Sequence, residues 1–201
     1  DPSSPVSGAS TCLRGGEPEV EERGVSMGGL LGTADGDVPI WALDAYRPPL
    51  STMLVALKER GSWQLGRPLG QALARVVAAA LLAHPGSVMA PGLSTIWLAP
   101  IPSDQRAVRS RGIDHTWLLA RRAGRDLGLP VGHLLARSRP VADQATLGRA
   151  ARRQAQAHSM TAGGTPRRVV VVDDVFTTGA TVLEATRALQ AGGHEVLSIA
   201  V

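Results

Sequence analysis

The architecture of this chain can be inferred from one segment, Arg168-Val169-Val170-Val171-Val172-Asp173-Asp174-Val175-Phe176-Thr177-Thr178-Gly179-Ala180-Thr181. Four consecutive valines are typical of a strand that is buried on both faces, as strands of parallel sheets are. Two carboxylates follow this strand, and a turn of small residues leads into a helix predicted over residues 178–190. A strand that passes through a short turn into a helix is typical of α/β proteins with crossover connections.

The turn after the strand has the properties of a phosphate site. In open parallel sheets, ligands bind at the carboxyl ends of the strands. The following helix N-terminus offers unpaired N–H groups and about half a positive charge, which suits a phosphate. Gly179 allows unusual backbone dihedral angles, and Thr177, Thr178 and Thr181 add hydroxyl donors. The pattern therefore predicts a phosphate at the start of this helix.

The two carboxylates of Asp173 and Asp174 require a different partner, because they would repel a phosphate. Vicinal ribose hydroxyls are good donors to ionised carboxylates, and such charge-assisted hydrogen bonds are strong. The ligand that fits both parts is a 5-phosphorylated ribose. Two adjacent aspartates alone could instead cap the helix or hold Mg²⁺, but the valines before them and the Thr-Thr-Gly-Ala-Thr after them favour the sugar phosphate.

The rest of the chain alternates between predicted helices and strands. Apolar spacing predicts helices over residues 50–60, 66–83 and 114–127, with Asp114 as the N-cap of the third and Gly128 after its last turn. Residues 140–166 are polar, and we expect them to be part helix and part mobile loop. The strands are predicted at residues 39–43, 94–99, 130–137, 167–173 and 195–201. The fold class is therefore α/β, with a mainly parallel central sheet flanked by helices.

Two regions differ in composition. Residues 1–37 are rich in Gly, Ser, Pro and Glu, so we predict a flexible N-terminal lead-in followed by one domain over residues 38–201. The formal charge is +4, from 21 basic and 17 acidic side chains, and the lead-in holds seven of the acids and two of the arginines. The remaining 19 basic and 10 acidic side chains make a basic body, which suits polyanions such as phosphate, pyrophosphate or nucleic acid.

Other features narrow the class of protein. The single cysteine, Cys12, excludes an internal disulfide and a cysteine-based zinc cluster, and it favours a reducing cytoplasm. No apolar run approaches the ~20 residues that span a bilayer, so we expect a soluble protein without a membrane partner. Residues 1–16 have neither a basic start nor an apolar stretch, and we expect no secretory signal there. The P-loop, dinucleotide, Gly-x-Ser-x-Gly and His-Glu-x-x-His motifs are absent.

Residues 169–181 resemble the ribose-phosphate signature of the type I phosphoribosyltransferases. Shorter matches, in the same order along the chain, resemble the ComF family of this fold and extend from about Ala45 to the C-terminus. They are Ala45-Tyr46-Arg47, Leu57-Lys58-Glu59-Arg60-Gly61, Ala99-Pro100-Ile101-Pro102, Arg109-Ser110-Arg111-Gly112, and Gln144 with Leu147 and Arg152.

The chain departs from the ComF pattern in three places. The cysteine-rich zinc module of such proteins is represented only by Cys12. The family's Arg-Gly-Phe-Asn-Gln is here Arg111-Gly112-Ile113-Asp114-His115, and its Arg-x-x-Asn is here Arg152-Arg153-Gln154-Ala155. Both of the latter departures lie where pyrophosphate and acceptor contacts are expected, so donor binding is better supported than turnover.

The resemblance implies a type I phosphoribosyltransferase fold with a small hood. It also implies a site for phosphoribosyl pyrophosphate and Mg²⁺, and transfer of the phosphoribosyl group to an unidentified acceptor with release of pyrophosphate. Mg²⁺ would be held mainly through ligand oxygens, with Asp173 and Asp174 as candidate protein ligands. Asp173, Asp174 and Arg111 are the candidate catalytic residues.

The remaining candidates divide between the two ends of the donor. The basic residues among them could instead form a solvated face of a loop or helix. His115, at a predicted helix start, is a weaker candidate for contact with the acceptor or a phosphate. The ribose phosphate is assigned to Asp173, Asp174, Val175, Phe176, Thr177, Thr178, Gly179, Ala180 and Thr181, and the pyrophosphate to a loop and its neighbours, Lys58, Pro100, Ile101, Pro102, Arg106, Arg109 and Arg111.

Two other classes of function stay open at this point. One is a non-catalytic accessory or regulatory protein that binds phosphoribosyl pyrophosphate, which the departures at Ile113 to His115 and at Ala155 motivate. The other is a link to DNA uptake, through a competence or DNA-processing protein partner, which the ComF resemblance implies. The sequence leaves the acceptor, a homodimeric state and direct contact with nucleic acid open.

Overall fold

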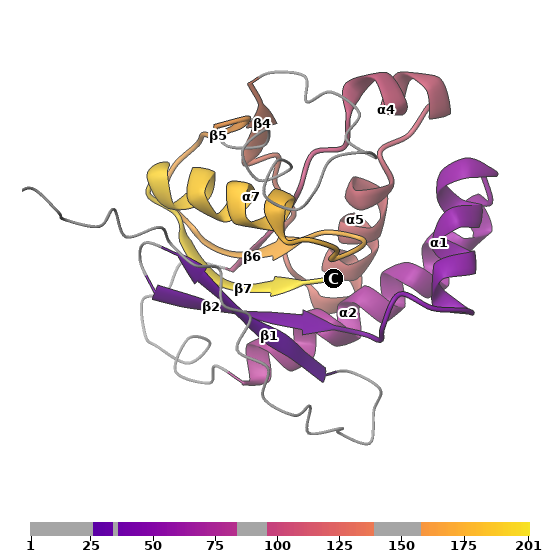
Figure 1. Cartoon of the computed structure of the whole chain (residues 1–201), viewed down its shortest axis with the longest axis horizontal. Coiled ribbons are helices and arrows are strands. Elements are labelled where there is room, and N and C mark those ends of the chain that lie inside the picture. The colour runs from indigo at the N-terminus through magenta and orange to yellow at the C-terminus, as the bar shows by residue number, and fades with distance from the viewer. Residues whose placement is uncertain (1–25, 34–35, 84–95, 139–157) are drawn as a thin grey trace, which may run out of the picture.

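A five-stranded sheet lies at the centre of the computed structural model, which describes residues 26–33, 36–83, 96–138 and 158–201 (Figure 1). The strand order is β1-β2-β7-β6-β3, in which β1 and β2 are antiparallel and β2, β7, β6 and β3 are parallel. The strands are β1 (Ser26–Thr33), β2 (Gly36–Ala42), β3 (Trp97–Pro100), β6 (Arg168–Val172) and β7 (Glu195–Ala200). A separate antiparallel pair consists of β4 (Leu135–Arg137) and β5 (Met160–Ala162).

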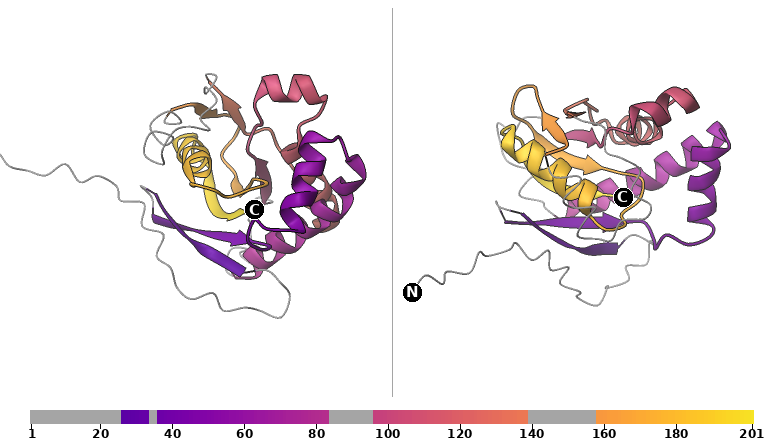
Figure 2. Two further views of the ribbon diagram at one scale, coloured as in Figure 1. Left: turned by 45° about the vertical axis from the view of Figure 1, so that its right-hand side comes forward. Right: turned by 45° about the horizontal axis from the view of Figure 1, so that its top comes forward.

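Helices cover both faces of the central sheet. The helices are α1 (Leu50–Glu59), α2 (Gly66–Leu82), α4 (Gln105–Arg111), α5 (His115–Leu127) and α7 (Ala180–Ala191), with a 3₁₀ turn, η1 (Trp63–Leu65), before α2. The packed pair α2 and α5 covers one face, and α7 covers the other (Figure 2). None of the helices in the described ranges is long and apolar enough to cross a membrane.

Strand β6 joins the two halves of the hydrophobic core. Successive side chains of a strand point to opposite faces. Accordingly Val170 and Val172 pack with residues of α1, α2 and α5, whereas Val169 and Val171 pack with residues of α7. All four valines are fully buried. The predicted α/β class, with a mainly parallel sheet flanked by helices and a central strand buried on both faces, is confirmed.

The helix that begins near residue 114 is also confirmed, together with both of its caps. The carboxylate of Asp114 accepts a hydrogen bond from the N–H of Trp117 at 3.1 Å. Gly128 ends α5 with a φ of 67°, in the left-handed region where glycine is favoured. The sequence therefore specifies this helix locally, at both ends.

Helix α4 was not expected, because Arg106, Arg109 and Arg111 were treated as neighbours of a pyrophosphate-binding loop and no helix was predicted there. Asp104 caps this helix by accepting hydrogen bonds from the N–H groups of Arg106 and Ala107. Gly112 ends it with a φ of 78°. Seven residues make only two turns, which is too short for an apolar repeat to be recognised, so the caps were the only available signal.

Two other boundaries differ from the prediction. Strand β1 lies inside the 1–37 segment treated as a lead-in and pairs with β2, so the sheet extends N-terminal to Val38, while residues 1–25 lie outside the described part. The strand predicted over 130–137 is shorter: β4 pairs with β5, and only Val131 bridges to Leu98 of the main sheet. Most of the 140–166 segment, with Gln144, Leu147 and Arg152, lies outside the described residues.

A pair of leucine substitutions tests the position of the core. Leu98 of β3 is fully buried, whereas Leu82 at the end of α2 is 79% exposed. Leu98→Ala should lower the free energy of unfolding by about 2–5 kcal/mol, through lost burial and a residual cavity. Leu82→Ala should change it by no more than about 0.5 kcal/mol. Urea unfolding followed by circular dichroism measures both, and equal effects would contradict this description of the core.

Candidate functional site

The carboxyl ends of three parallel strands meet at one edge of the sheet. The N–H of Asp173 donates to the carbonyl of Ala200 at 3.1 Å, just after β6 and at the end of β7. The N–H of Ile101, just after β3, donates to the carbonyl of Val172 at 2.9 Å. These bonds fix the Asp173–Asp174 pair next to the Pro100–Pro102 turn. In parallel sheets this edge is the usual place for a ligand.

The carboxylate of Asp173 is held by the backbone of Asp174, and the carboxylate of Asp174 by a lysine from α1. The N–H of Asp174 donates to Oδ1 of Asp173 at 2.9 Å. Nζ of Lys58 lies 2.5 Å from Oδ2 of Asp174, whose side chain is only 9% exposed. Lys58 therefore neutralises Asp174 directly, rather than standing apart as a free cation.

Asp173 has an unusual proton affinity for an aspartate. Burial of its carboxyl group raises its pKa to about 8, and the neighbouring charge of Asp174 acts in the same direction. The hydrogen bond from the Asp174 amide and the charges of Lys58 and Arg137 oppose this rise but do not cancel it. At neutral pH the pair therefore consists of a protonated Asp173 beside an ion-paired Asp174.

A histidine orients the arginine assigned to catalysis. Nη1 of Arg111, the last residue of α4, lies 3.0 Å from Nε2 of His115, the first residue of α5. Burial lowers the pKa of His115, with Lys58 and Arg111 adding to the effect and Asp174 opposing it. Since Arg111 can only donate, this contact assigns a neutral imidazole that accepts at Nε2 and carries its proton on Nδ1.

The two ends of the segment that connects β3 to α5 are hydrogen-bonded to each other. The hydroxyl of Ser103 donates to Oδ1 of Asp114 at 2.8 Å, so the segment that contains α4 begins and ends at one point. Nε of Arg137, in β4, donates to the carbonyl of Pro102 at 2.9 Å. Hydrogen bonds from the α4 N-terminus lower the pKa of Asp104, which keeps this cap charged. The Pro100–Pro102 turn is thus held from two sides.

The turn between β6 and α7 leaves a helix N-terminus without a side-chain cap. Gly179 is the N-cap residue and has a φ of 75°, which explains why a glycine stands there. Oγ1 of Thr178 accepts only a long hydrogen bond, 3.5 Å, from the N–H of Ala180. The first N–H groups of α7 can therefore bind an anion.

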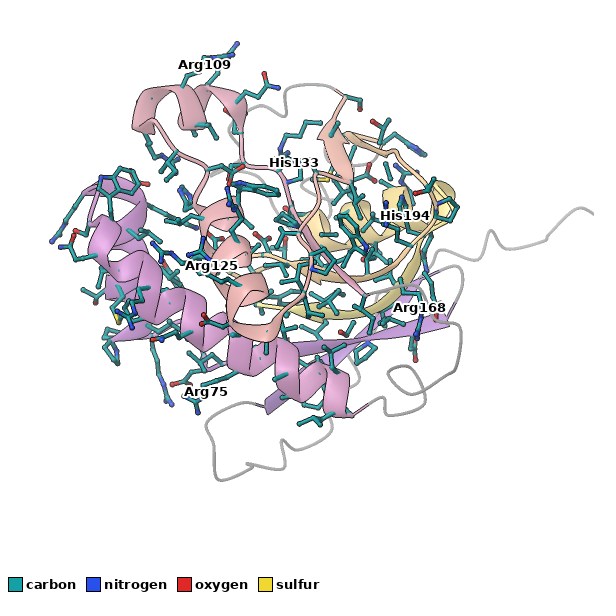
Figure 3. The ribbon with its side chains drawn as sticks, turned by 180° about the vertical axis from the view of Figure 1, so that it is seen from behind. Arg75, Arg109, Arg125, His133, Arg168 and His194 are labelled. Atoms are coloured by element: carbon teal, nitrogen blue, oxygen red, sulfur yellow. The ribbon has the colours of Figure 1, made fainter. Side chains whose placement is uncertain are left out.

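The structure brings together some of the predicted residues and separates others. Lys58 meets the Asp173–Asp174 pair, and the Pro100–Pro102 turn lies beside it. Arg111 points back to His115. Arg106 and Arg109 are exposed on α4, and in the described ranges neither forms an ion pair with the aspartates. Figure 3 shows Arg109 on the outer side of α4, pointing away from the body.

One residue of the site was not predicted. Arg137 contributes to the electrostatics of Asp173 and binds the carbonyl of Pro102. Nothing in its sequence neighbourhood marks it, because its role depends on the position of β4 relative to a turn 35 residues earlier in the chain. Local sequence patterns carry no signal for such a contact.

Comparisons with known proteins give only structural neighbours. No family model and no curated protein matches this chain. Among solved structures it is similar to adenine phosphoribosyltransferase from Leishmania tarentolae, with 19% identity, a TM-score of 0.36, and 79% of this chain and 75% of that one covered. The corresponding enzyme from Leishmania donovani gives 18% identity, a TM-score of 0.35, and coverage of 79% and 69%. Scores at this level do not establish a shared family.

The raised pKa of Asp173 predicts a specific pH dependence of stability. Between about pH 4 and about pH 8 the unfolded chain loses the Asp173 proton while the folded protein keeps it. This group therefore lowers the free energy of unfolding as pH rises through that range, and its contribution levels off above about pH 8. Asp173→Asn cannot ionise and removes this fall.

The measurement is urea unfolding of both proteins at several pH values, in the presence of a chelator. The stability of Asp173→Asn relative to the native chain should increase from pH 5 to pH 8 and then stay constant. Two parallel stability curves over this range would show that Asp173 ionises normally in the folded protein.

Proposed function

We propose that this chain binds phosphoribosyl pyrophosphate on a type I phosphoribosyltransferase fold and transfers the phosphoribosyl group to an acceptor, releasing pyrophosphate. The observation that carries the proposal is the position of Asp173 and Asp174. They lie at the carboxyl end of a fully buried parallel strand, and the turn over residues 175–179 leads from them to a helix N-terminus that no side chain caps. A phosphate and a pair of ribose hydroxyls, joined in one ligand, satisfy both features.

The 5-phosphate would bind at the start of α7. The helix supplies N–H groups and a positive dipole end, and Gly179 lets the backbone approach closely. Hydroxyls of Thr178 and Thr181 add donors from the turn and the first turn of the helix. Fixed backbone dipoles would therefore stabilise the phosphate charge.

The ribose hydroxyls would bind the two acids. Asp174 is an acceptor, and its bond to Lys58 leaves other lone pairs available. A protonated Asp173 can both donate to and accept from a hydroxyl. The pair therefore suits two adjacent hydroxyls better than a second phosphate.

The leaving pyrophosphate would be neutralised by Lys58 and Arg111. When the acceptor's lone pair forms its bond to C1 of the ribose, the C1–O bond breaks and its electron pair goes to pyrophosphate. Cations held beside the leaving oxygen stabilise that charge as it develops. His115 would keep Arg111 in position, because the two are already hydrogen-bonded. Arg106 and Arg109 are exposed on α4 and are less well placed for this task.

The donor set is compatible with Mg²⁺. Carboxylate oxygens are ligands that this ion prefers; Asp174 carries an ionised one beside Lys58, and Asp173 would add a second on losing its proton. The described residues contain no group of three or more side chains that could cage a metal. Mg²⁺ would therefore be held largely by the oxygens of the donor, where it would supply positive charge to the pyrophosphate.

A second candidate is a protein that binds the donor without efficient turnover. In this structure Lys58 is already paired with Asp174, and one N–H of Arg111 is already bonded to His115, so Lys58 must give up its partner before it can bind a leaving group. Pyrophosphate release measured over a panel of acceptors separates the two candidates. An acceptor-dependent rate, lost in Asp173→Asn/Asp174→Asn, supports the transferase, and donor binding without any such rate supports the accessory protein.

The single cysteine supports the proposal of a cytoplasmic location, and the ComF resemblance supports that of a partner protein in DNA uptake or processing. The basic body also suits direct contact with nucleic acid. Electrostatic binding to single-stranded DNA is strongest at low salt. Absence of binding under those conditions would restrict this proposal to a protein partner.

Calorimetric titration with phosphoribosyl pyrophosphate, with and without Mg²⁺, tests the donor site. The native chain should bind saturably and more tightly with Mg²⁺. Asp173→Asn/Asp174→Asn should weaken binding at least tenfold, because the ribose hydroxyls lose their charged acceptor. Asp126→Asn, an exposed aspartate on α5, is the matched control and should bind as the native chain does.

Failure of the native chain to bind this donor or ribose 5-phosphate would refute the proposed function. Equal loss of binding in Asp126→Asn would show that the effect comes from the change in net charge and not from the site.

A further inference from the structure

The two edges of the central sheet differ in how they are closed. One edge is β3, which has only four residues, ends at Pro100, and is bridged at Leu98 by Val131. The other edge is β1, which has eight residues (Figure 1). Among residues 26–33, 36–83, 96–138 and 158–201, β2 is the only strand that pairs with β1. The outer side of β1 therefore presents backbone groups that no described strand pairs.

The sequence of β1 lacks the features that usually protect an edge strand. Natural edge strands are short, carry charged side chains or proline, or are twisted away by bulges. The eight residues of β1, SMGGLLGT, include no charged residue and no proline. A shift in the pairing with β2 occurs between Met27 and Gly29, and the pairing from Gly29 to Thr33 is regular. This second half of β1 is a regular strand edge.

The neighbouring strand shows which backbone groups of β1 are already used. The carbonyl of Trp41, in β2, accepts a hydrogen bond from the N–H of Val201 at 2.9 Å. The N–H of Leu43 donates to the carbonyl of Val201 at 3.3 Å. Odd-numbered residues of β2 therefore direct their backbone groups toward β7. Because these directions alternate along a strand, its even-numbered residues direct theirs toward β1.

This alternation identifies the outward backbone groups of β1. Gly29 and Leu31 stand opposite even-numbered residues of β2, so their backbone groups are directed to β2. Leu30 stands opposite Pro39, which has no N–H to donate. Leu30 and Gly32 therefore direct their N–H and C=O groups away from β2, to the open edge.

We propose that β1 pairs with β1 of a second copy of this chain, antiparallel about a two-fold axis at Leu31. In this register Leu30 of each copy stands opposite Gly32 of the other. The two outward residues of each copy then exchange N–H···O=C hydrogen bonds with the two of its partner. A two-fold contact uses the same surface on both copies, and this pair of residues is complementary to itself.

Two properties of the sequence favour a second copy as the occupant. A residue near a two-fold axis meets its own copy, and like charges placed opposite each other on adjacent strands are destabilising. β1 carries no charge, so two copies of it do not repel each other. The register also sets a large residue, Leu30, opposite a small one, Gly32, on both sides of the axis.

The pairing is independent of the proposed function. Because the two β1 strands run antiparallel, the parallel strands of the two copies run in opposite directions. The edges that carry Asp173 and Asp174 therefore lie on opposite sides of the joined sheet. Loss of the dimer should leave binding of phosphoribosyl pyrophosphate unchanged, and failure of donor binding would leave the dimer in place.

Sedimentation equilibrium of the full chain, over about a hundredfold range of concentration, tests the pairing. The native chain should change from monomer to dimer as its concentration rises. Leu30→Pro removes the outward N–H but no hydrogen bond to β2, and it should weaken self-association at least tenfold. Leu30→Val is the matched control, because it keeps the N–H and favours a strand, and it should associate as the native chain does.

A native chain that stays monomeric at every concentration would overturn the proposal. So would unchanged association of Leu30→Pro, because the dimer would then use another surface. If Leu30→Pro fails to fold by circular dichroism, amide hydrogen exchange of the native chain decides. The amides of Leu30 and Gly32 should exchange more slowly as the dimer forms. Exchange that does not depend on concentration, whether fast or slow, would refute the pairing.

Discussion

Burial of β6 between two helical layers is the constraint on which the other features of the site depend. Its four valines fill both halves of the core, so the strand cannot shift or rotate without exposing apolar surface. Asp173 and Asp174 follow without a break, and the same burial that fixes them also withholds water from them. The raised pKa of Asp173 and the ion pair of Asp174 are two responses to that loss of solvation.

The parts of the fold that follow from local chemistry could be predicted from the sequence. The valine run identifies β6, and Asp114 with Gly128 marks both ends of α5. Helix α4 was missed because two turns are too few for an apolar repeat. Strand β1 was missed because its glycine-rich sequence lacks strand alternation, and pairing with β2 supplies the order that its residues do not specify.

The candidate site, like the fold, could be predicted only where local sequence determines it. Asp173, Asp174 and Gly179 occur within one short motif, whose strand, turn and helix are confirmed as structure. Lys58 was assigned to pyrophosphate from its own neighbourhood, but its contact with Asp174 depends on how α1 crosses the sheet edge. The contact of Arg137 with the Pro102 carbonyl depends in the same way on tertiary packing. Short motifs fix residue types and local turns, and only the packed chain fixes their partners.

The ion pairs of the free protein bear on how a partly buried site could accept a highly charged donor. A buried charge without a partner is strongly destabilising, whereas a paired one is tolerated. In the proposed reaction Lys58 would exchange Asp174 for a pyrophosphate oxygen while a ribose hydroxyl replaces Lys58 at Asp174. Arg111 would likewise exchange a neutral His115 for an anion. Lys58 and Arg111 would each gain an anionic partner, and Asp174 would keep a hydrogen bond to a ribose hydroxyl, so no group of the site would be left without a polar partner when the donor enters.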